Sequence, residues 1–273
     1  MKTIIQILVM ALVLAGMQQA IAQGTGVKGD QQRKYHFEEA GKDMPYHLYV
    51  PASYDASKAT PLIIALHGFG GDQDTFFKAV KNLQALCDQY GFIFAAPMGY
   101  SSSGWFGAPM SIPGMTPQGV VTPPAKAGEY SKQVRERMLS ELDVINVLDI
   151  VRGEYNIDSK RTYLMGHSMG GFGAWYMGDK YIDMWAAIAP MSGINEPQKH
   201  ILNITNLARV PLLVAVGEQE ASTVITSKEA VASLKAAGAD VTYVEIAGGS
   251  HGSMIAPSTA RIFEFFSKHR KTP

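Results

Sequence analysis

Six short apolar runs, separated by stretches of helical periodicity, constrain the fold of this 273-residue chain more than any other feature. The runs are continuously apolar, as expected for strands that are covered on both faces. The alternation of such strands with helices predicts an α/β fold with a mostly parallel central sheet and helices on both faces. The strands are expected at residues 61–68, 92–98, 161–168, 186–193, 211–218 and 241–248, and the helices at 74–90, 131–154, 169–180, 224–237 and 255–269.

The longest of these predicted helices contains a regular apolar pattern. Its members recur at steps of four, four, three and three residues, which predicts one apolar stripe along the helix. They are Val134, Met138, Leu142, Ile145 and Leu148.

The first 22 residues have the layout of a signal peptide. Lys2 is followed by an apolar stretch over residues 4–15 and by the small-x-small sequence that ends at Ala22. The apolar part is too short for a comfortable membrane span, although a retained N-terminal anchor is the alternative interpretation. We therefore expect cleavage after Ala22, a secreted or periplasmic protein, and no stable membrane span once the signal is removed.

A polar linker is expected at residues 23–33, before the folded part of the chain begins. Residues 34–40 and 46–51 then flank "GKDMP", which predicts a hairpin of two antiparallel strands at the start of the sheet. The remaining length fits a single domain, so we assign residues 34–273 to one domain.

Charge argues against nucleic-acid binding, and the cysteine content excludes an internal disulfide. Removal of residues 1–22 takes away Lys2 and no acid, which changes 24 basic and 24 acidic side chains to 23 and 24, a net charge of −1. A nearly neutral chain without a basic run gives no electrostatic reason to expect nucleic-acid binding. The single cysteine, Cys87, cannot form an internal disulfide and is interpreted as a small core residue.

Two segments contain the pattern Gly-x-Ser-x-Gly, and their contexts differ. The first is centred on Ser168, follows a predicted strand and opens a predicted helix, so its serine would lie on a sharp strand-to-helix turn with an exposed hydroxyl. The second is centred on Ser250 and has only His269 downstream as a candidate base. Because a serine hydroxyl needs a base to become a nucleophile, Ser168 is the candidate.

His251 is the candidate base among the seven histidines of the chain. It lies in "GGSHGSM", directly after the last predicted strand and before a helix, which is where a general base for Ser168 is expected. The other six histidines lie in the hairpin, beside a candidate turn, next to the nucleophile or on polar stretches. They are His36, His47, His67, His167, His200 and His269.

Stabilisation of a negative oxygen in the transition state requires backbone N–H donors near Ser168. Met169, at the start of the predicted helix, would supply one donor. The second would come from Phe69 or Gly68 in "LHGFGG", a glycine-rich turn after the first long parallel strand.

The segments "LHGFGG", "GHSMGG" and "GGSHG", in this order, resemble the α/β-hydrolase fold. Residues 155–177, "YNIDSKRTYLMGHSMGGFGAWYM", resemble the secreted esterase branch that includes feruloyl-esterase-like, polyhydroxybutyrate-depolymerase-like and prolyl-oligopeptidase-like serine hydrolases. The resemblance covers residues 34–270. It implies an α/β-hydrolase domain and a triad that runs nucleophile, acid, histidine. No large cap domain is expected, because only a loop separates the strands at residues 101–128.

The resemblance also points to the triad acid. Many members of the fold have an aspartate three residues after the glycine that ends the penultimate strand, and here that count from Gly217 leads to Glu220. This is a departure from the commoner aspartate, although a glutamate can hold the imidazole in the same way. Glu218 and Glu196 remain alternatives, the latter because some relatives place the acid after the preceding strand.

Residues 101–128 form a long stretch rich in Gly, Pro and Ser that leaves a strand end and should border the site. Trp105 and Phe106, flanked by glycines, are candidates for substrate contact, and so are His67 and His167 beside the two glycine-rich turns. No metal site and no cofactor are expected, since the sequence has no HExxH, cysteine pair or phosphate loop.

These observations predict an exported serine esterase that hydrolyses small-molecule or polymer-borne carboxylic esters through an acyl-enzyme. A prolyl-oligopeptidase-like peptidase or amidase, an acyltransferase, and a non-catalytic binding protein on the same scaffold are the alternatives. The acyl group, the alcohol and the oligomeric state are left open by the sequence.

Overall fold

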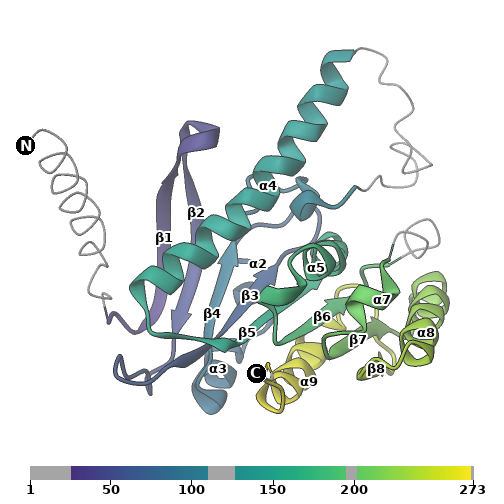
Figure 1. Cartoon of the computed structure of the whole chain (residues 1–273). Coiled ribbons are helices and arrows are strands. Elements are labelled where there is room, and N and C mark those ends of the chain that lie inside the picture. Colours follow the sequence, from purple (N-terminus) through teal and green to yellow (C-terminus); the bar gives the residue numbers. More distant parts are fainter. Residues whose placement is uncertain (1–25, 110–126, 195–201, 272–273) are drawn as a thin grey trace, which may run out of the picture.

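A single eight-stranded sheet forms the centre of the computed structural model, which describes residues 26–109, 127–194 and 202–271. The strand order is β1-β2-β4-β3-β5-β6-β7-β8, with β1–β2 and β2–β4 antiparallel and every other pair parallel. This confirms the predicted mostly parallel sheet that begins with an antiparallel hairpin (Figure 1). The strands are β1 (Gly29–Phe37), β2 (Lys42–Val50), β3 (Thr60–Leu66), β4 (Ile93–Pro97), β5 (Ile157–His167), β6 (Ala187–Met191), β7 (Leu212–Gly217) and β8 (Val241–Ile246).

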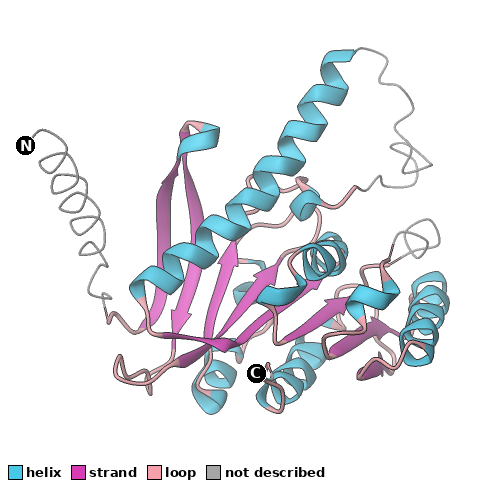
Figure 2. Cartoon of the chain, in the orientation of Figure 1, coloured by secondary structure: helices cyan, strands magenta, loops and turns pink. Residues whose placement is uncertain are grey.

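Helices pack on both faces of this sheet, as predicted (Figure 2). On one face, side chains of α4, α5 and α8 form one buried apolar cluster with the sheet; on the other, side chains of α2, α3 and α9 form a second. The helix expected over 74–90 is two helices, and α7 was not predicted. The helices are α2 (Thr75–Ala79), α3 (Leu83–Tyr90), α4 (Ala127–Glu154), α5 (Met169–Lys180), α7 (Ile204–Leu207), α8 (Ala221–Ala236) and α9 (Ile255–Ser267).

Two sequence predictions need correction here. Residues 29–33 are the first half of strand β1 rather than part of a linker, because they pair in register with residues 46–50 of β2. The predicted apolar stripe of α4 is also wrong in part, since Met138 is 57% exposed while Val144, Val147 and Val151 are buried. The predicted signal peptide, residues 1–22, lies outside the described residues.

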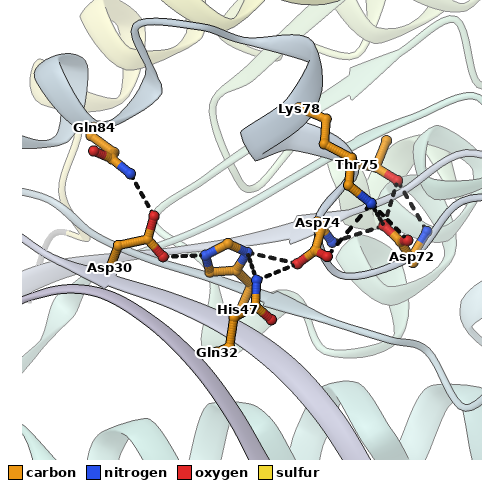
Figure 3. Close-up of polar contacts among 8 residues, drawn as sticks. All are labelled: Asp30, Gln32, His47, Asp72, Asp74, Thr75, Lys78 and Gln84. Carbon is orange, nitrogen blue, oxygen red and sulfur yellow. Dashed lines mark hydrogen bonds and ion pairs between the residues drawn. The ribbon is translucent and has the colours of Figure 1, made fainter.

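A polar network around His47 joins the β1–β2 hairpin to the helices on one face (Figure 3). The buried His47 ring lies between two carboxylates, with Nε2 2.5 Å from Asp30 Oδ1 and Nδ1 2.8 Å from Asp74 Oδ1. The ring also stacks on Phe77, with 3.4 Å between centroids. Gln32 donates to Asp74 Oδ1 at 2.7 Å, so residues of β1, β2 and the start of α2 share one network.

The order of the strands determines which loops can meet. Strand β5 is central, with β3 and β4 on one side and β6, β7 and β8 on the other. The parallel strands end at one edge of the sheet, which is where open α/β sheets bind ligands. The described helices include none that is long and apolar enough to cross a bilayer.

Candidate active site

Ser168 lies on the sharp turn between β5 and α5 that the sequence predicts. Its backbone has φ 56° and ψ −117°, a conformation that is costly for a residue with a side chain and is typical of functional sites. Its amide donates to Met191 O at 2.9 Å, which fastens the turn to β6. The half-buried serine side chain thus protrudes at the carboxyl edge of the sheet.

The glycines around Ser168 are required by close contacts. A Cβ atom on Gly170 would lie 1.9 Å from Leu66 O, and one on Gly166 would lie 2.1 Å from Gly170 O. Helix α5 therefore starts directly against the ends of β3 and β5, as the role of the flanking glycines in the sequence pattern requires.

His251 and Glu220 meet Ser168 from the loops after β8 and β7. His251 Nε2 lies 2.8 Å from Ser168 Oγ, and His251 Nδ1 lies 2.5 Å from Glu220 Oε2. The His251 side chain is about half exposed, whereas that of Glu220 is 10% exposed. The three predicted residues therefore form a continuous hydrogen-bonded chain from carboxylate to imidazole to hydroxyl.

The Glu220 carboxylate is oriented by two further donors. Its Oε1 accepts from Ser192 Oγ at 2.6 Å and from the Gly217 amide at 3.1 Å. Burial disfavours its negative charge, but the hydrogen bonds from His251, Ser192 and Gly217 outweigh burial and hold the pKa of Glu220 below its usual value. Sequence reasoning missed Ser192. Its only sequence signal is its position directly after β6, beside the strand that leads to Glu220.

The alternative acid Glu218 and the alternative serine Ser250 have other hydrogen-bond partners. Glu218 Oε2 accepts from the Gly248 amide at 2.6 Å, and Glu196 lies outside the described residues. Ser250 Oγ lies 3.0 Å from Ser253 Oγ. In the described part of the chain the ring nitrogens of His251 pair with Glu220 and Ser168, and neither Glu218 nor Ser250 forms a hydrogen bond with them.

The turn that carries the predicted donors Gly68 and Phe69 lies against the nucleophile. A Cβ atom on Gly68 would lie 3.4 Å from Ser168 Cβ, so the turn after β3 lies against the serine. The turn is fixed by the Gly71 amide, which donates to Gly68 O at 3.0 Å, and by the Gly70 amide, which donates to Ser102 O at 2.8 Å. Within the described residues the amides of Phe69 and Met169 have no hydrogen-bond acceptor.

Three side chains expected to contact substrate are buried instead. His67 is buried with both ring nitrogens 2.8 Å from carbonyl oxygens, those of Gly68 and Met98. Phe106 is 0% exposed and fits where Gly99 and Gly173 lack side chains, so it anchors its loop. These placements contradict the prediction of direct substrate contact.

His167 is the third of these residues. Burial and the neighbouring His251 lower its pKa to about 4, so the ring is neutral near pH 7. Its Nε2 donates to His251 O at 2.7 Å. Through this hydrogen bond, His167 fixes the backbone of the loop that carries His251.

Trp105 remains half-buried at the surface. Its ring centroid lies 6.3 Å from that of Phe69 and 5.8 Å from that of Phe172, the residue one helical turn after Ser168. Of the long loop expected over 101–128, residues 110–126 lie outside the described residues. Within the described ranges, no group of three or more His, Cys, Asp or Glu side chains is arranged to hold a metal ion.

Comparison with known proteins identifies relatives that are named as acetylxylan and feruloyl esterases. The chain is 30% identical over 158 residues to a bifunctional acetylxylan esterase/xylanase of Neocallimastix patriciarum, a match that covers 57% of this chain and 18% of the relative. It is 27% identical over 175 residues to feruloyl esterase B of Neurospora crassa, covering 64% of this chain and 52% of the relative. The chain thus spans about half or less of the length of these relatives.

The fold is shared with a solved ferulic acid esterase from Anaeromyces mucronatus in complex with ferulic acid. The TM-score is 0.62 at 17% sequence identity, and the alignment covers 92% of this chain and 94% of that chain. This likeness establishes the α/β-hydrolase fold. The model of the Esterase family, described as "Putative esterase", matches residues 38–272. Because this match spans most of the sequence, the chain belongs to that family.

Proposed function

We propose that this protein is an exported serine esterase that hydrolyses carboxylic esters through an acyl-enzyme. The observation that carries the proposal is the chain of contacts from Glu220 through His251 to Ser168, with distances of 2.5 and 2.8 Å. Membership of the Esterase family supports the choice of an ester as substrate.

In the proposed mechanism, His251 Nε2 takes the proton of Ser168 as the serine oxygen attacks the ester carbonyl. The carbonyl oxygen becomes negative and accepts hydrogen bonds from the amides of Phe69 and Met169. His251 then gives its proton to the alcohol oxygen, and the alcohol leaves. Water, activated by His251, releases the acid and restores Ser168.

Glu220 stays ionised throughout this cycle. It accepts from His251 Nδ1, which leaves Nε2 free to act as the base, and it stabilises the imidazolium that forms in the transition state. Ser192 and the Gly217 amide hold the carboxylate in the required orientation.

Esters carried by plant polysaccharides are the proposed substrates. Two relatives are named for acetylxylan and feruloyl ester hydrolysis, and an exported enzyme would meet such polymers outside the cell. The signal-peptide pattern of residues 1–22 supports export. Mass spectrometry of the exported protein tests this point: a chain that begins at Gln23 is expected, and a full-length chain retained in the membrane would contradict export.

Activity is tested with purified protein on 4-nitrophenyl acetate, methyl ferulate, acetylated xylan and an Ala-Pro anilide, beside Ser168→Ala. We expect turnover of esters by the wild type, and a loss of roughly 10⁴-fold or more in Ser168→Ala. Cleavage of the anilide alone would identify a peptidase. A folded wild type that hydrolyses none of the four would overturn the proposal.

A further inference from the structure

The turn that carries the proposed oxyanion donor Phe69 is tied to the segment that follows β4. The Gly70 amide, one residue after Phe69, donates to Ser102 O at 2.8 Å. Residues 101–103 are three consecutive serines, which we call the serine loop. The middle serine thus meets the turn through its backbone carbonyl, and the position of that carbonyl bears on the position of the turn.

The direction of the Phe69 N–H depends on how this turn is held. Gly68 O and the Phe69 N–H belong to one planar trans peptide unit and point in opposite directions, so the contacts that fix Gly68 O also fix the N–H. Gly68 O accepts from the Gly71 amide at 3.0 Å and lies 2.8 Å from His67 Nδ1. A displaced turn would therefore rotate the donor away from the place where the oxyanion forms.

Glu136 on α4 holds the serine loop on both sides of Ser102. Its Oε1 accepts from Ser101 Oγ at 2.5 Å and from Ser103 Oγ at 3.1 Å. The Ser103 amide in turn donates to Ser101 Oγ at 3.2 Å. All four side chains are half-buried, and hydrogen bonds to a carboxylate are stronger than those between neutral groups. One carboxylate oxygen therefore determines where the Ser102 carbonyl lies.

The backbone next to the serine loop adopts conformations that need such support. Tyr100 has φ 62°, and Trp105 and Phe106 have φ 58° and 50°, all in the left-handed region that disfavours residues with side chains. Asp143 of α4 accepts from the Tyr100 amide at 3.0 Å. Ser140 of the same helix accepts from the Phe106 amide at 3.0 Å. Strain of this kind persists only where the surroundings enforce it, and it gathers at functional sites.

We propose that Glu136 is a positioning residue for the oxyanion donor Phe69 and acts through the serine loop. Its hydrogen bonds in the described residues go to that loop and not to the triad. A donor stabilises the transition state only when it lies where the negative charge develops, so a misplaced Phe69 amide lowers kcat more than it changes KM. This inference rests on the proposed serine-esterase function and adds to it a residue remote from the triad.

The test compares Glu136→Ala with Glu136→Gln, which keeps an acceptor oxygen at the same reach. On 4-nitrophenyl acetate we expect kcat of Glu136→Ala to fall about tenfold or more, with KM changed less than about twofold, and Glu136→Gln to recover most of the loss. Asp149→Ala is the matched control, since it removes an exposed carboxylate near the other end of α4, and it should behave like wild type.

Binding of a transition-state analogue gives a second measurement. Phenylboronic acid forms a tetrahedral adduct with a serine such as Ser168, and one boronate oxygen takes the place of the oxyanion. Its inhibition constant should rise in Glu136→Ala by a factor similar to the fall in kcat. A role of Glu136 in folding alone would not weaken this inhibitor in a folded variant.

The three consecutive serines separate side-chain from main-chain effects. The double variant Ser101→Ala/Ser103→Ala removes both donors to Glu136 and should reproduce the loss of kcat in Glu136→Ala. Ser102→Ala keeps the carbonyl that the Gly70 amide contacts and should lower kcat much less. If Glu136→Ala does not fold, the double serine variant makes the same test with α4 unchanged.

Exchange of the Gly70 amide hydrogen, followed by NMR, reports on the turn independently of catalysis. Because this amide donates to Ser102 O, it should exchange faster in Glu136→Ala than in Asp149→Ala. Unchanged kcat, boronate inhibition and Gly70 exchange in folded Glu136→Ala would overturn the positioning role, and so would a raised KM with unchanged kcat. A wild type that hydrolyses no ester would overturn the esterase function, while Gly70 exchange would still decide whether Glu136 holds the turn.

Discussion

Glu220, the proposed triad acid, reaches His251 with a side chain one methylene longer than that of aspartate. Its backbone amide donates to Gly217 O at 3.0 Å, which folds the segment into a tight turn and brings the carboxylate back over the end of β7. Its two oxygens then divide their partners, with His251 on one and Ser192 and Gly217 on the other. The residue is thus positioned by its own turn.

Glu220→Gln should lower kcat by about 10⁴-fold with a much smaller effect on KM, because an amide donor facing Nδ1 favours the wrong imidazole tautomer. Steady-state kinetics on 4-nitrophenyl acetate measure the change. Glu218→Gln is the control, two residues away, and should stay within a few-fold of wild type. Equal losses in both variants would remove Glu220 from the triad.

His167 makes folding stability depend on pH. Its pKa is lowered from 6.5 to about 4 in the folded protein, so the unfolded chain binds a proton that the folded protein excludes. The stabilising contribution of the neutral ring is fully present above pH 6.5 and is lost as the pH falls through about 4.

His167→Gln keeps an amide donor for His251 O and removes the titration. We expect its free energy of unfolding in urea to fall less than that of wild type between pH 7 and pH 4. Parallel pH profiles for the two proteins would show that His167 does not contribute.

At the scale of elements, the N-terminus of α5 depends on an unusually close backbone contact. A methyl group on Gly170 would meet Leu66 O at 1.9 Å and His67 O at 2.7 Å, and backbone atoms of a central strand cannot move aside. Gly153, near the end of α4, has open space around it and an ordinary helical backbone.

Gly170→Ala should therefore lower the free energy of unfolding by about 2 kcal/mol or more and disturb Ser168. Gly153→Ala should raise it by about 0.5–1 kcal/mol, because alanine favours the helix. Urea unfolding of both variants measures this contrast, and a neutral Gly170→Ala would mean that β3 and α5 are farther apart than described.

The buried face of helix α4 was predicted incorrectly from the sequence. Apolar periodicity led to a stripe through Met138, yet over residues 136–143 the helix packs through polar side chains. Glu136 accepts from Ser103 Oγ at 3.1 Å, Ser140 accepts from the Phe106 amide, and Asp143 accepts from the Tyr100 amide at 3.0 Å. These residues are four and three positions apart and form one helical face, which hydrophobicity does not reveal because its partners are serine hydroxyls and backbone amides of a loop.

At the scale of the molecule, the sheet was the most predictable feature. Apolar runs identified strands β3 to β8, although β8 at the sheet edge is not covered on both faces as predicted, and the glycine-rich turns identified the loops that meet at Ser168. The start of β1 was missed because its polar residues, "GDQQR", pair with β2 at an exposed edge of the sheet, where apolar residues are not required. The contacts of Ser192, His167 and Phe106 join segments that are far apart in the sequence, so residue spacing could not predict them.

The network around His47 should stabilise the whole domain by tying this edge hairpin to α2. Burial disfavours the charge of Asp74, but hydrogen bonds from Gln32 and His47 hold its pKa below 3.8. The contribution of the charged carboxylate is therefore present above pH 3.8 and is lost as the pH falls through the lowered value.

Asp74→Asn should lower the free energy of unfolding at pH 7 by about 1–3 kcal/mol, because it replaces the charged carboxylate that pairs with the buried His47 ring by a neutral amide. Asp72→Asn removes a more exposed carboxylate that pairs with Lys78 and should cost less than about 1 kcal/mol. Thermal unfolding at pH 7 and pH 3 checks both values. A loss for Asp74→Asn that is equal at the two pH values would contradict the role of its charge.

The central position of β5 also bears on how such a protein can diversify. The proposed oxyanion donor Phe69 and the half-buried Trp105 are encoded before Ser168, whereas Glu220 and His251 are encoded in the last quarter of the gene. Recombination that replaces residues 99–107 would alter the surface around Trp105 and leave the proton-transfer residues untouched. The loops on the two sides of Ser168 can then be exchanged separately, so the surface beside the site can change without rebuilding the triad.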